Sequence, residues 1–247
     1  MKLISKLTLA GIISLTIPAL VTASDSTGDG VNKKYNVTPR TESSTTLDFA
    51  EASHLTFMRE EEKLARDVYL TFAEMYPDQP VFSNIANKSE QTHTDIMRDN
   101  LALYDVEDPN PDTNNLPESL GVFTGKEWGW YFEGKFQDLI AAGYDSELYA
   151  LYVGALIEEL DMHDITDCPQ VMLDSTEVAY PDPCGLDYTD ESGLINAYSS
   201  LIDGSENHLR AYVGQIEAVE GYCSYGAQYL TQEEVDDILD RSCDDDD

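Results

Sequence analysis

The sequence predicts an all-α fold, in which four amphipathic helices pack as a bundle around charged residues. Four stretches repeat apolar residues at steps of three and four, which places side chains on one helix face. In each stretch a residue type that commonly binds metals interrupts the repeat near its middle: Glu62, Glu90 with His93, Glu158, and His208. Because uncompensated charges are costly to bury, we expect these side chains to hold a cation inside a four-helix bundle.

The first helix is expected over about residues 51–76, ending before Pro77. Its predicted inward face is Met58, Glu62, Ala65, Tyr69 and Phe72. Glu60 and Glu61 lie off this face, so we expect both carboxylates to be solvated. His54, near the helix start, is also expected at the surface.

The second helix is expected from about Ser83 to Tyr104, after a short connection. Its repeat is Ala86, Glu90, His93, Met97, Leu101 and Tyr104. The spacing Glu90-x-x-His93 puts both side chains on one face about one turn apart, so both can reach one ion. The alternative is a surface pair on a slightly rotated helix, but the apolar neighbours favour burial.

The third helix is expected over about residues 146–165, with the repeat Leu148, Leu151, Ala155, Glu158, Met162 and Ile165. Glu158 fits this face, whereas Glu159 lies about 100° round the helix. Asp161 is one turn beyond Glu158 and is therefore a candidate second carboxylate from the same helix. His163 points away from the face of Glu158, and we expect it at the surface.

The fourth helix is expected over about residues 189–220, with the repeat Leu194, Tyr198, Leu201, Ser205, His208 and Tyr212. For His208, a buried imidazole bonded to a carboxylate is the alternative to metal ligation. Aromatic residues over 126–142 predict short helices that end at Gly143, and a small terminal helix is expected over 231–239.

The connection between the second and third helices is long, about forty residues, whereas the first two helices are closely joined. A long crossover at this point is the layout of ferritin-like bundles and differs from a simple up-down-up-down order. Within the crossover, Asp108 to Pro117 is rich in Pro, Asn and Asp and is expected to be irregular.

The N-terminus has the pattern of a secretory signal peptide over residues 1–23. Lys2 and Lys6 precede an apolar run from Leu7 to Val21, and small residues lie before Ser24. An uncleaved anchor is the alternative, but the run is short for a membrane span. The remaining chain divides into a flexible polar leader (24–50), the bundle domain (51–222) and a C-terminal short helix with an acidic tail (223–247).

The chain is strongly acidic, with 14 Lys and Arg against 48 Asp and Glu and a formal net charge of −34. Such a surface repels nucleic acid and anionic lipid, so we expect neither as a partner. We expect a secreted or periplasmic protein with no membrane span after signal cleavage. The charge favours a saline environment, where screening relaxes self-repulsion; solubility alone is the alternative.

Four cysteines agree with export to an oxidising compartment: Cys168, Cys184, Cys223 and Cys243. Local pairing, Cys168 with Cys184 and Cys223 with Cys243, is preferred because each disulfide would staple a loop or tail that lacks its own core. A thiolate metal site is the alternative, which these spacings disfavour.

Several blocks resemble known ferritin-like proteins. Glu62, Ala65 and Tyr69 resemble the first-helix motif of rubrerythrin-type proteins. The fuller set is similar to the ferritin-like family known as domain of unknown function 2202, over about residues 51–215. Its blocks here are Phe57-Met-Arg-Glu-Glu-Glu-Lys-Leu-Ala-Arg-Asp-Val-Tyr69, Phe82-Ser-Asn-Ile-Ala86, Ser89-Glu-Gln-Thr-His93, Val153-Gly-Ala-Leu-Ile-Glu-Glu-Leu-Asp161 and Gly204-Ser-Glu-Asn-His-Leu-Arg-Ala-Tyr212.

The resemblance implies a metal site whose ligands are Glu62, Glu90, His93, Glu158 and His208. A ferritin-like di-iron site carries Glu-x-x-His on two helices, but this chain has Ser205 three residues before His208. One bridging carboxylate is therefore missing unless Asp161 supplies it, and this departure leaves both a di-iron and a mono-iron site open.

Carboxylate and imidazole donors favour iron, with manganese or zinc as alternatives. We expect an exported metal-binding protein with oxidase or ferroxidase-like activity. The alternatives are a metal-binding or sequestering protein without turnover and an acidic secreted structural protein. Neither a Gly-x-Ser-x-Gly elbow nor a phosphate-binding loop is present in the sequence. The oligomeric state stays open.

Overall fold

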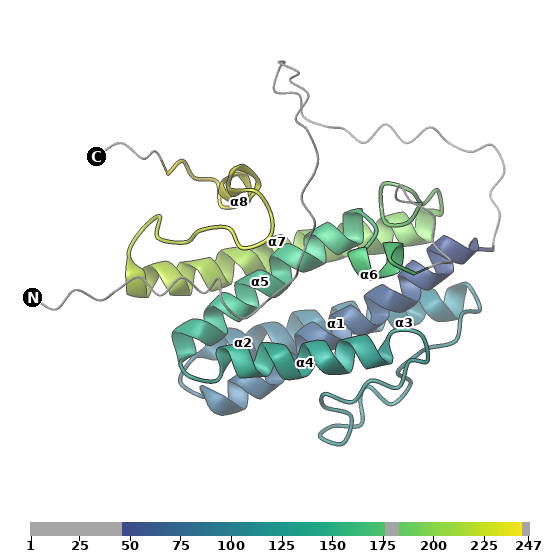
Figure 1. Ribbon diagram of the computed structural model, residues 1–247, viewed down its shortest axis with the longest axis horizontal. Helices are drawn as coiled ribbons and strands as arrows, with labels where there is room; N and C mark the ends of the chain where they lie inside the picture. Colours follow the sequence, from purple (N-terminus) through teal and green to yellow (C-terminus); the bar gives the residue numbers. More distant parts are fainter. Residues whose placement is uncertain (1–45, 176–182, 244–247) are drawn as a thin grey trace, which may run out of the picture. The chain divides into compact units, whose positions relative to one another are not determined.

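The computed structural model describes residues 46–175 and 183–243, and over these ranges its regular structure is entirely helical. The all-α prediction is therefore confirmed. The signal peptide over 1–23, most of the leader and the last four residues of the tail lie outside the described residues. The elements are α1 (Phe49–Met75), α2 (Pro80–Asn84), the π-helical turn η1 (Ile85–Glu90), α3 (Gln91–Leu103), α4 (Gly129–Gly143), α5 (Glu147–Thr166), α6 (Gln170–Leu173), α7 (Ser192–Glu220) and α8 (Gln232–Ile238) (Figure 1).

Helix α1 starts at a capping box, slightly earlier than the sequence predicts. The Asp48 side chain accepts from the Glu51 backbone N–H, and the Glu51 carboxylate accepts from the Asp48 N–H, each at 2.9 Å. All residues of the predicted inward face are buried: Met58, Glu62, Ala65, Tyr69 and Phe72. The apolar repeat thus identified the face of α1 that packs against the other helices.

The prediction that Glu60, Glu61 and His54 face solvent is wrong, since all three are buried. Helix α4 packs beside α1, and the segment that joins α3 to α4, residues 104–128, covers a further side of α1. We call this the covering segment. Arg59 on α1 donates to Asp108 of this segment at 3.2 Å, so charged residues of α1 bind the chain that excludes water from them.

The second long helical unit is composite, because α2, η1 and α3 follow one another without a break from Pro80 to Leu103. Gln79 caps its start by accepting from the Val81 N–H. The π-helical turn η1 holds an extra residue compared with an α-helical turn, a feature often found at functional sites. Glu90 is its last residue and is buried, so the turn leads directly to one of the predicted ligands.

Helices α5 and α7 pack closely along their lengths and lie side by side in Figure 1. Ser146 caps α5 by accepting from the Tyr149 N–H at 3.2 Å. Close approach is possible because Gly154 has no β-carbon, which would otherwise collide with the Tyr212 ring on α7. Helix α4 is one continuous helix, whereas the sequence predicted several short ones.

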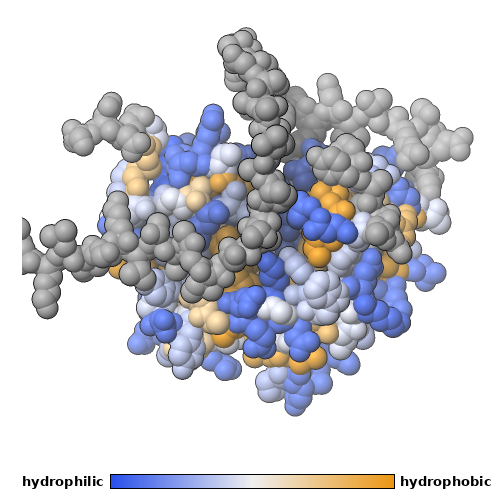
Figure 2. Space-filling view, viewed as in Figure 1, coloured by the Kyte–Doolittle hydropathy of each residue, from blue (hydrophilic) through white to orange (hydrophobic). Residues whose placement is uncertain are grey.

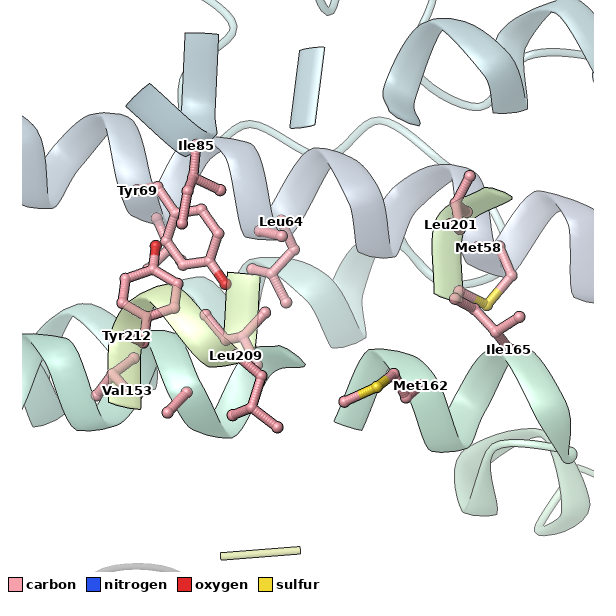
Figure 3. Close-up of a cluster of buried hydrophobic side chains, with 14 of the residues drawn as sticks. Met58, Leu64, Tyr69, Ile85, Val153, Met162, Ile165, Leu201, Leu209 and Tyr212 are labelled. Carbon is pink, nitrogen blue, oxygen red and sulfur yellow. The ribbon is translucent and has the colours of Figure 1, made fainter. Parts of the chain in front are cut away.

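Buried apolar side chains form two separate groups along the helices (Figure 3). Tyr69, Tyr212 and Val153 belong to one group of labelled side chains, whereas Met58 and Ile165 belong to another. Glu62 lies between Met58 and Tyr69 on α1, and Glu158 lies between Val153 and Ile165 on α5. The charged residues therefore occupy a layer with hydrophobic packing on each side.

Both predicted disulfides are present. Cys168 is bonded to Cys184 after α5, and Cys223 is bonded to Cys243 after α7, so no cysteine is free. The preference for local pairing is confirmed. The first disulfide links residues 16 apart in the sequence, and the second links residues 20 apart.

The described surface is largely hydrophilic on the face drawn in Figure 2, with hydrophobic side chains in scattered patches. Among the described helices, none is both long enough and apolar enough to span a bilayer.

The C-terminal strap, residues 223–243, is anchored on α5 by one buried carboxylate. Glu159, which points away from the predicted ligands, accepts from the backbone N–H groups of Gln228, Tyr229 and Leu230 at 2.9, 2.6 and 2.9 Å. It also accepts from the Tyr225 hydroxyl at 2.6 Å. Charge-assisted bonds of this kind are among the stronger ones in proteins, so Glu159 holds the strap in place.

We expect Glu159→Gln to loosen the strap, because an amide oxygen replaces only part of the carboxylate's acceptor capacity. The free energy of unfolding should fall by about 2–3 kcal/mol. Hydrogen exchange should show faster exchange at the amides of 228–230, while α1 keeps its protection. Glu133→Gln, at an exposed position on α4, is the control. Unchanged protection at 228–230 in the Glu159 variant would contradict this account.

Candidate metal centre

Two groups of three ligand-type residues meet inside the helices, and they share Glu90. One group is Glu62, Glu90 and His93, and the other is Glu90, Glu158 and His208. Within each group the ligand atoms lie within 4.8 Å of one another, and every member is buried. The five residues come from α1, η1, α3, α5 and α7, so the fold brings together all five side chains that interrupt the predicted apolar repeats.

The two oxygens of Glu90 face different imidazoles. Glu90 Oε2 lies 3.6 Å from His93 Nδ1, and Glu90 Oε1 lies 2.8 Å from His208 Nδ1. Each imidazole is also close to one further carboxylate: His93 Nδ1 is 3.2 Å from Glu62 Oε2, and His208 Nδ1 is 3.2 Å from Glu158 Oε2. A carboxylate with one oxygen on each side is suited to bridge two cations.

Asp161 lies beside these groups and is connected to α7 through Ser205. The Ser205 hydroxyl donates to Asp161 Oδ2, while Asp161 Oδ1 is buried without a hydrogen-bond partner. The Asp161 carboxylate also interacts electrostatically with Glu62, Glu158 and Glu90. It is therefore a carboxylate of the centre, although it belongs to neither group of three.

Several buried oxygens at the centre lack hydrogen-bond partners within the described part of the chain. Besides Asp161 Oδ1 these are Glu62 Oε1 and Glu90 Oε1, the latter close to His208 but not aligned for a hydrogen bond. A buried polar atom without a partner costs about 1–3 kcal/mol, and more when it is charged. Carboxylate oxygens and imidazole nitrogens are donors that iron, manganese and zinc accept, so the residues present fit a bound metal.

The ionisation of the centre favours two positive imidazoles when no metal is bound. Burial lowers the pKa of His93, but the facing carboxylates of Glu62 and Glu90 outweigh it and raise this pKa to about 12. Burial likewise opposes protonation of His208, yet Glu158 and Glu90 raise its pKa to about 10. A metal that binds Nδ1 must displace these protons, so binding releases protons.

Burial and the nearby imidazoles shift the pKa values of Glu62 and Glu90 in opposite directions. Burial raises the pKa of Glu62 to about 7 despite the nearby His93. Burial would also raise the pKa of Glu90, but the two imidazolium groups hold it below its ordinary value. Glu90 is therefore the most firmly ionised member of the centre, as its position between two cationic groups requires.

A tyrosine and a glycine orient the ligands. The Tyr69 hydroxyl donates to Glu158 Oε1 at 2.6 Å, which leaves Oε2 of that carboxylate for His208. Opposite His93, Gly204 on α7 provides the space for the imidazole, because a β-carbon there would collide with Nε2 and Cε1 of the ring. The backbone of α7 thus contacts the His93 ring directly.

The remaining histidines are separate from the two groups. His54 is fully buried, with Nδ1 2.8 Å from the Tyr198 hydroxyl and Nε2 2.8 Å from the Asp164 carbonyl oxygen. Burial lowers the pKa of His54 to about 4, which makes it a neutral core residue that links α1, α5 and α7. His163 is partly exposed and lies 2.8 Å from Asp164 Oδ1.

Together these features define an all-helical protein with a buried cluster of carboxylates and imidazoles. Residues 51–179 and 184–242 match the family described as an uncharacterized protein domain, DUF2202. The chain belongs to this family, as the sequence blocks predicted.

A relative of known structure supports the same assignment. The uncharacterized protein MJ0754 of Methanocaldococcus jannaschii is 36% identical over 185 residues, which cover 75% of this chain and 84% of that protein. A crystal structure described as hypothetical protein MJ0754 from Methanococcus jannaschii matches with a TM-score of 0.64 and 35% identity, covering 79% of this chain and 95% of that one.

Gly204→Ala is expected to displace the His93 ring and to weaken metal retention. In a helix this change normally stabilises by about 1 kcal/mol, so a loss of stability would report the collision. Gly214→Ala on the same helix is the matched control, since nothing lies within 4 Å of the added β-carbon. Thermal unfolding should occur at a lower temperature and metal content should be lower in Gly204→Ala than in Gly214→Ala. Equal values in the two variants would show that His93 has room to move.

The metal-free protein should lose stability as the pH rises above neutrality. The pKa of His208 is about 10 in the folded chain against an ordinary value of 6.5. Its stabilising effect is complete below pH 6.5 and is lost as the pH rises towards 10. Urea unfolding of chelator-treated protein between pH 7 and 9.5 measures this slope. His208→Gln should reduce the slope of the unfolding free energy against pH by the equivalent of about one bound proton. An unchanged slope would contradict the raised pKa of His208.

Proposed function

We propose that this chain is an exported ferritin-like protein that binds two metal ions in its core and oxidises Fe(II). The observation that carries the proposal is Glu90, which presents one oxygen to each of two groups of carboxylate and imidazole donors. A single buried ion pair would need only one such group. Two groups around one carboxylate are the arrangement expected for two ions held close together.

The proposed ligands are divided between the two ions. One ion would be held by Glu62, Glu90 and His93, and the other by Glu90, Glu158 and His208. The oxygen of Asp161 that lacks a partner supports its role as a further carboxylate of the centre.

Ser205 explains how Asp161 could replace a missing ligand. Ser205 precedes His208 by three residues, as Glu90 precedes His93. It has no carboxylate of its own, but its hydroxyl holds Asp161, which reaches across from α5. In the proposed centre, the neighbouring helix therefore supplies the negative charge that the second Glu-x-x-His motif would carry.

The helix arrangement supports a ferritin-like bundle. The four long units are α1, the α2–η1–α3 unit, α5 and α7, and the crossover between the second and third units contains the covering segment and α4. This order is that of bundles with one long crossover, in which inward-facing Glu and His residues hold metals.

Iron is the proposed metal, with manganese or zinc as alternatives for the same donors. Oxidation of two Fe(II) ions supplies two electrons, which together with two protons reduce dioxygen to hydrogen peroxide. The chain would contribute carboxylates that neutralise the ions, imidazoles that release their protons when a metal binds, and apolar layers that exclude water.

Export is part of the proposal. The N-terminal pattern over 1–23 supports it, and two disulfides among the described residues are typical of proteins outside the reducing cytosol. The excess of Asp and Glu would concentrate cations near the surface.

Metal content of the purified protein tests the proposal. Wild-type protein loaded with Fe(II) or Mn(II) without oxygen should retain about two ions per chain. Glu90→Gln removes the shared carboxylate and should abolish retention of both ions, whereas Glu62→Gln and Glu158→Gln should each weaken mainly one. Glu206→Gln is the control, because Glu206 belongs to neither ligand group and pairs with Arg210. Equal metal content in wild-type and Glu90→Gln protein would exclude this site.

Oxygen consumption with Fe(II) separates catalysis from storage. The proposed activity predicts oxygen uptake by wild-type protein and its loss in Glu62→Ala. Retention of two ions without oxygen uptake would instead indicate a metal-binding or sequestering protein without turnover. That second function has a structural basis, because Ser205 replaces the Glu of a second Glu-x-x-His motif. The carboxylate that its hydroxyl contacts belongs to Asp161 on α5.

A further inference from the structure

A second group of buried acids lies next to the candidate metal centre and belongs to neither set of three ligands. Its members are Glu61 on α1 and Asp164 on α5, which are only 8% and 7% exposed. The Glu61 carboxylate interacts electrostatically with Asp164, with Asp161 and with Glu62. Carboxylates therefore follow one another from Asp164 through Glu61 to the centre.

The oxygens of these acids lack the hydrogen-bond partners that buried structural acids usually have. Glu61 Oε2 and Asp161 Oδ1 are both buried without a hydrogen-bond partner, in side chains that are 8% and 4% exposed. In contrast, the fully buried Glu159 accepts from three backbone N–H groups and a tyrosine hydroxyl. Unpartnered buried oxygens on two acids that interact electrostatically favour a cation at this place.

The outer end of the group is close to solvent. Asp164 Oδ1 lies 2.8 Å from Nδ1 of His163, which is one-third exposed. The Tyr229 ring of the C-terminal strap packs edge-on against His163, with centroids 5.0 Å apart. Lys135 of α4 is partly exposed and interacts with both Glu61 and Asp164. The acids thus extend from a partly exposed histidine to the buried ligands.

The group does not have the geometry of a third metal site. Among the described residues, the sets of three ligand atoms within 4.8 Å of one another are the two that share Glu90. Glu61, Asp161 and Asp164 do not form such a set. Acids that are close enough to attract a cation, but not arranged to hold it tightly, are suited to transient binding.

We propose that Asp164 and Glu61 form a cation passage that delivers divalent metal ions from the His163 side of the molecule to Asp161 and the two ligand groups. This inference rests on the proposed function, because a passage requires a metal centre at its end. Its ligand class is a divalent cation, bound transiently by carboxylate oxygens. The acids attract the ion, and Lys135, which interacts with both Glu61 and Asp164, moderates that attraction at the outer end.

The rate of metal loading tests the passage separately from the centre. Metal-free protein with both disulfides intact is mixed with Co²⁺, and binding is followed by visible absorbance in a stopped-flow instrument. Glu61→Gln keeps the side-chain shape and should slow loading by about tenfold or more, with the wild-type number of ions bound at equilibrium. Asp164→Asn should slow loading in the same way.

Two further variants keep the test decisive. Lys135→Met removes a positive charge beside the acids at a partly exposed position, so loading should become severalfold faster. Glu60→Gln is the matched control on the same helix. Glu60 is buried and its Oε2 also lacks a hydrogen-bond partner, but its charged neighbours are Glu127 and Lys63, and it accepts from Asn110 Nδ2 at 3.2 Å. Its loading rate should equal that of the wild type.

The possible outcomes distinguish this inference from the proposed function. Wild-type protein that binds no metal would overturn both. Wild-type protein that binds two ions, together with wild-type loading rates in Glu61→Gln and Lys135→Met, would overturn the passage alone. Loss of one bound ion at equilibrium in Glu61→Gln would also overturn it, because Glu61 would then be a permanent ligand.

Discussion

The carboxylate of Glu90 stands between two imidazoles, and the position of every other charged group in the core depends on this contact. The two imidazoles attract Glu62 and Glu158 from the other side, at 3.2 Å in each case. Five ionisable groups can be buried together because positive and negative groups alternate. Even so, three acids already face two imidazoles, and Asp161 adds a fourth acid. This excess is the physical reason to expect a cation, because hydrophobic packing alone cannot repay the burial of unbalanced charge.

The helix period alone located most of the centre. The five side chains that interrupt the apolar repeats meet in the folded chain, since a repeat at steps of three and four fixes which face of each helix turns inward. The same reasoning placed Glu159 on another face, where it anchors the strap. Local disulfide pairing was also predictable, because each pair staples a loop or tail for which the sequence predicts no core of its own.

The errors have two causes. Glu60 and Glu61 lie off the inward face of α1, and a bundle of four helices would leave them in solvent. They are buried because α4 and the covering segment pack on the outside of α1, and helix periodicity contains no information about such long-range coverage. His54 instead lies one turn before Met58 on the inward face, where it contacts Asp164 on α5 and Tyr198 on α7. The contact of Ser205 with Asp161 likewise joins two helices, and neither sequence motif predicts it by itself.

The positions of Glu90 and His93 depend on how many residues the π-helical turn η1 contains, as well as on which residues they are. Phe82 before the turn and His93 after it are both buried, although the wider turn changes the angular offset between α2 and α3. Removal of one residue from this turn would rotate one helix relative to the other by about 100°. After such a deletion the chain would bury either the Phe82 ring or the His93 imidazole, but not both. A one-residue deletion that changes no candidate ligand would thus separate the packing of the helices from the assembly of the candidate centre.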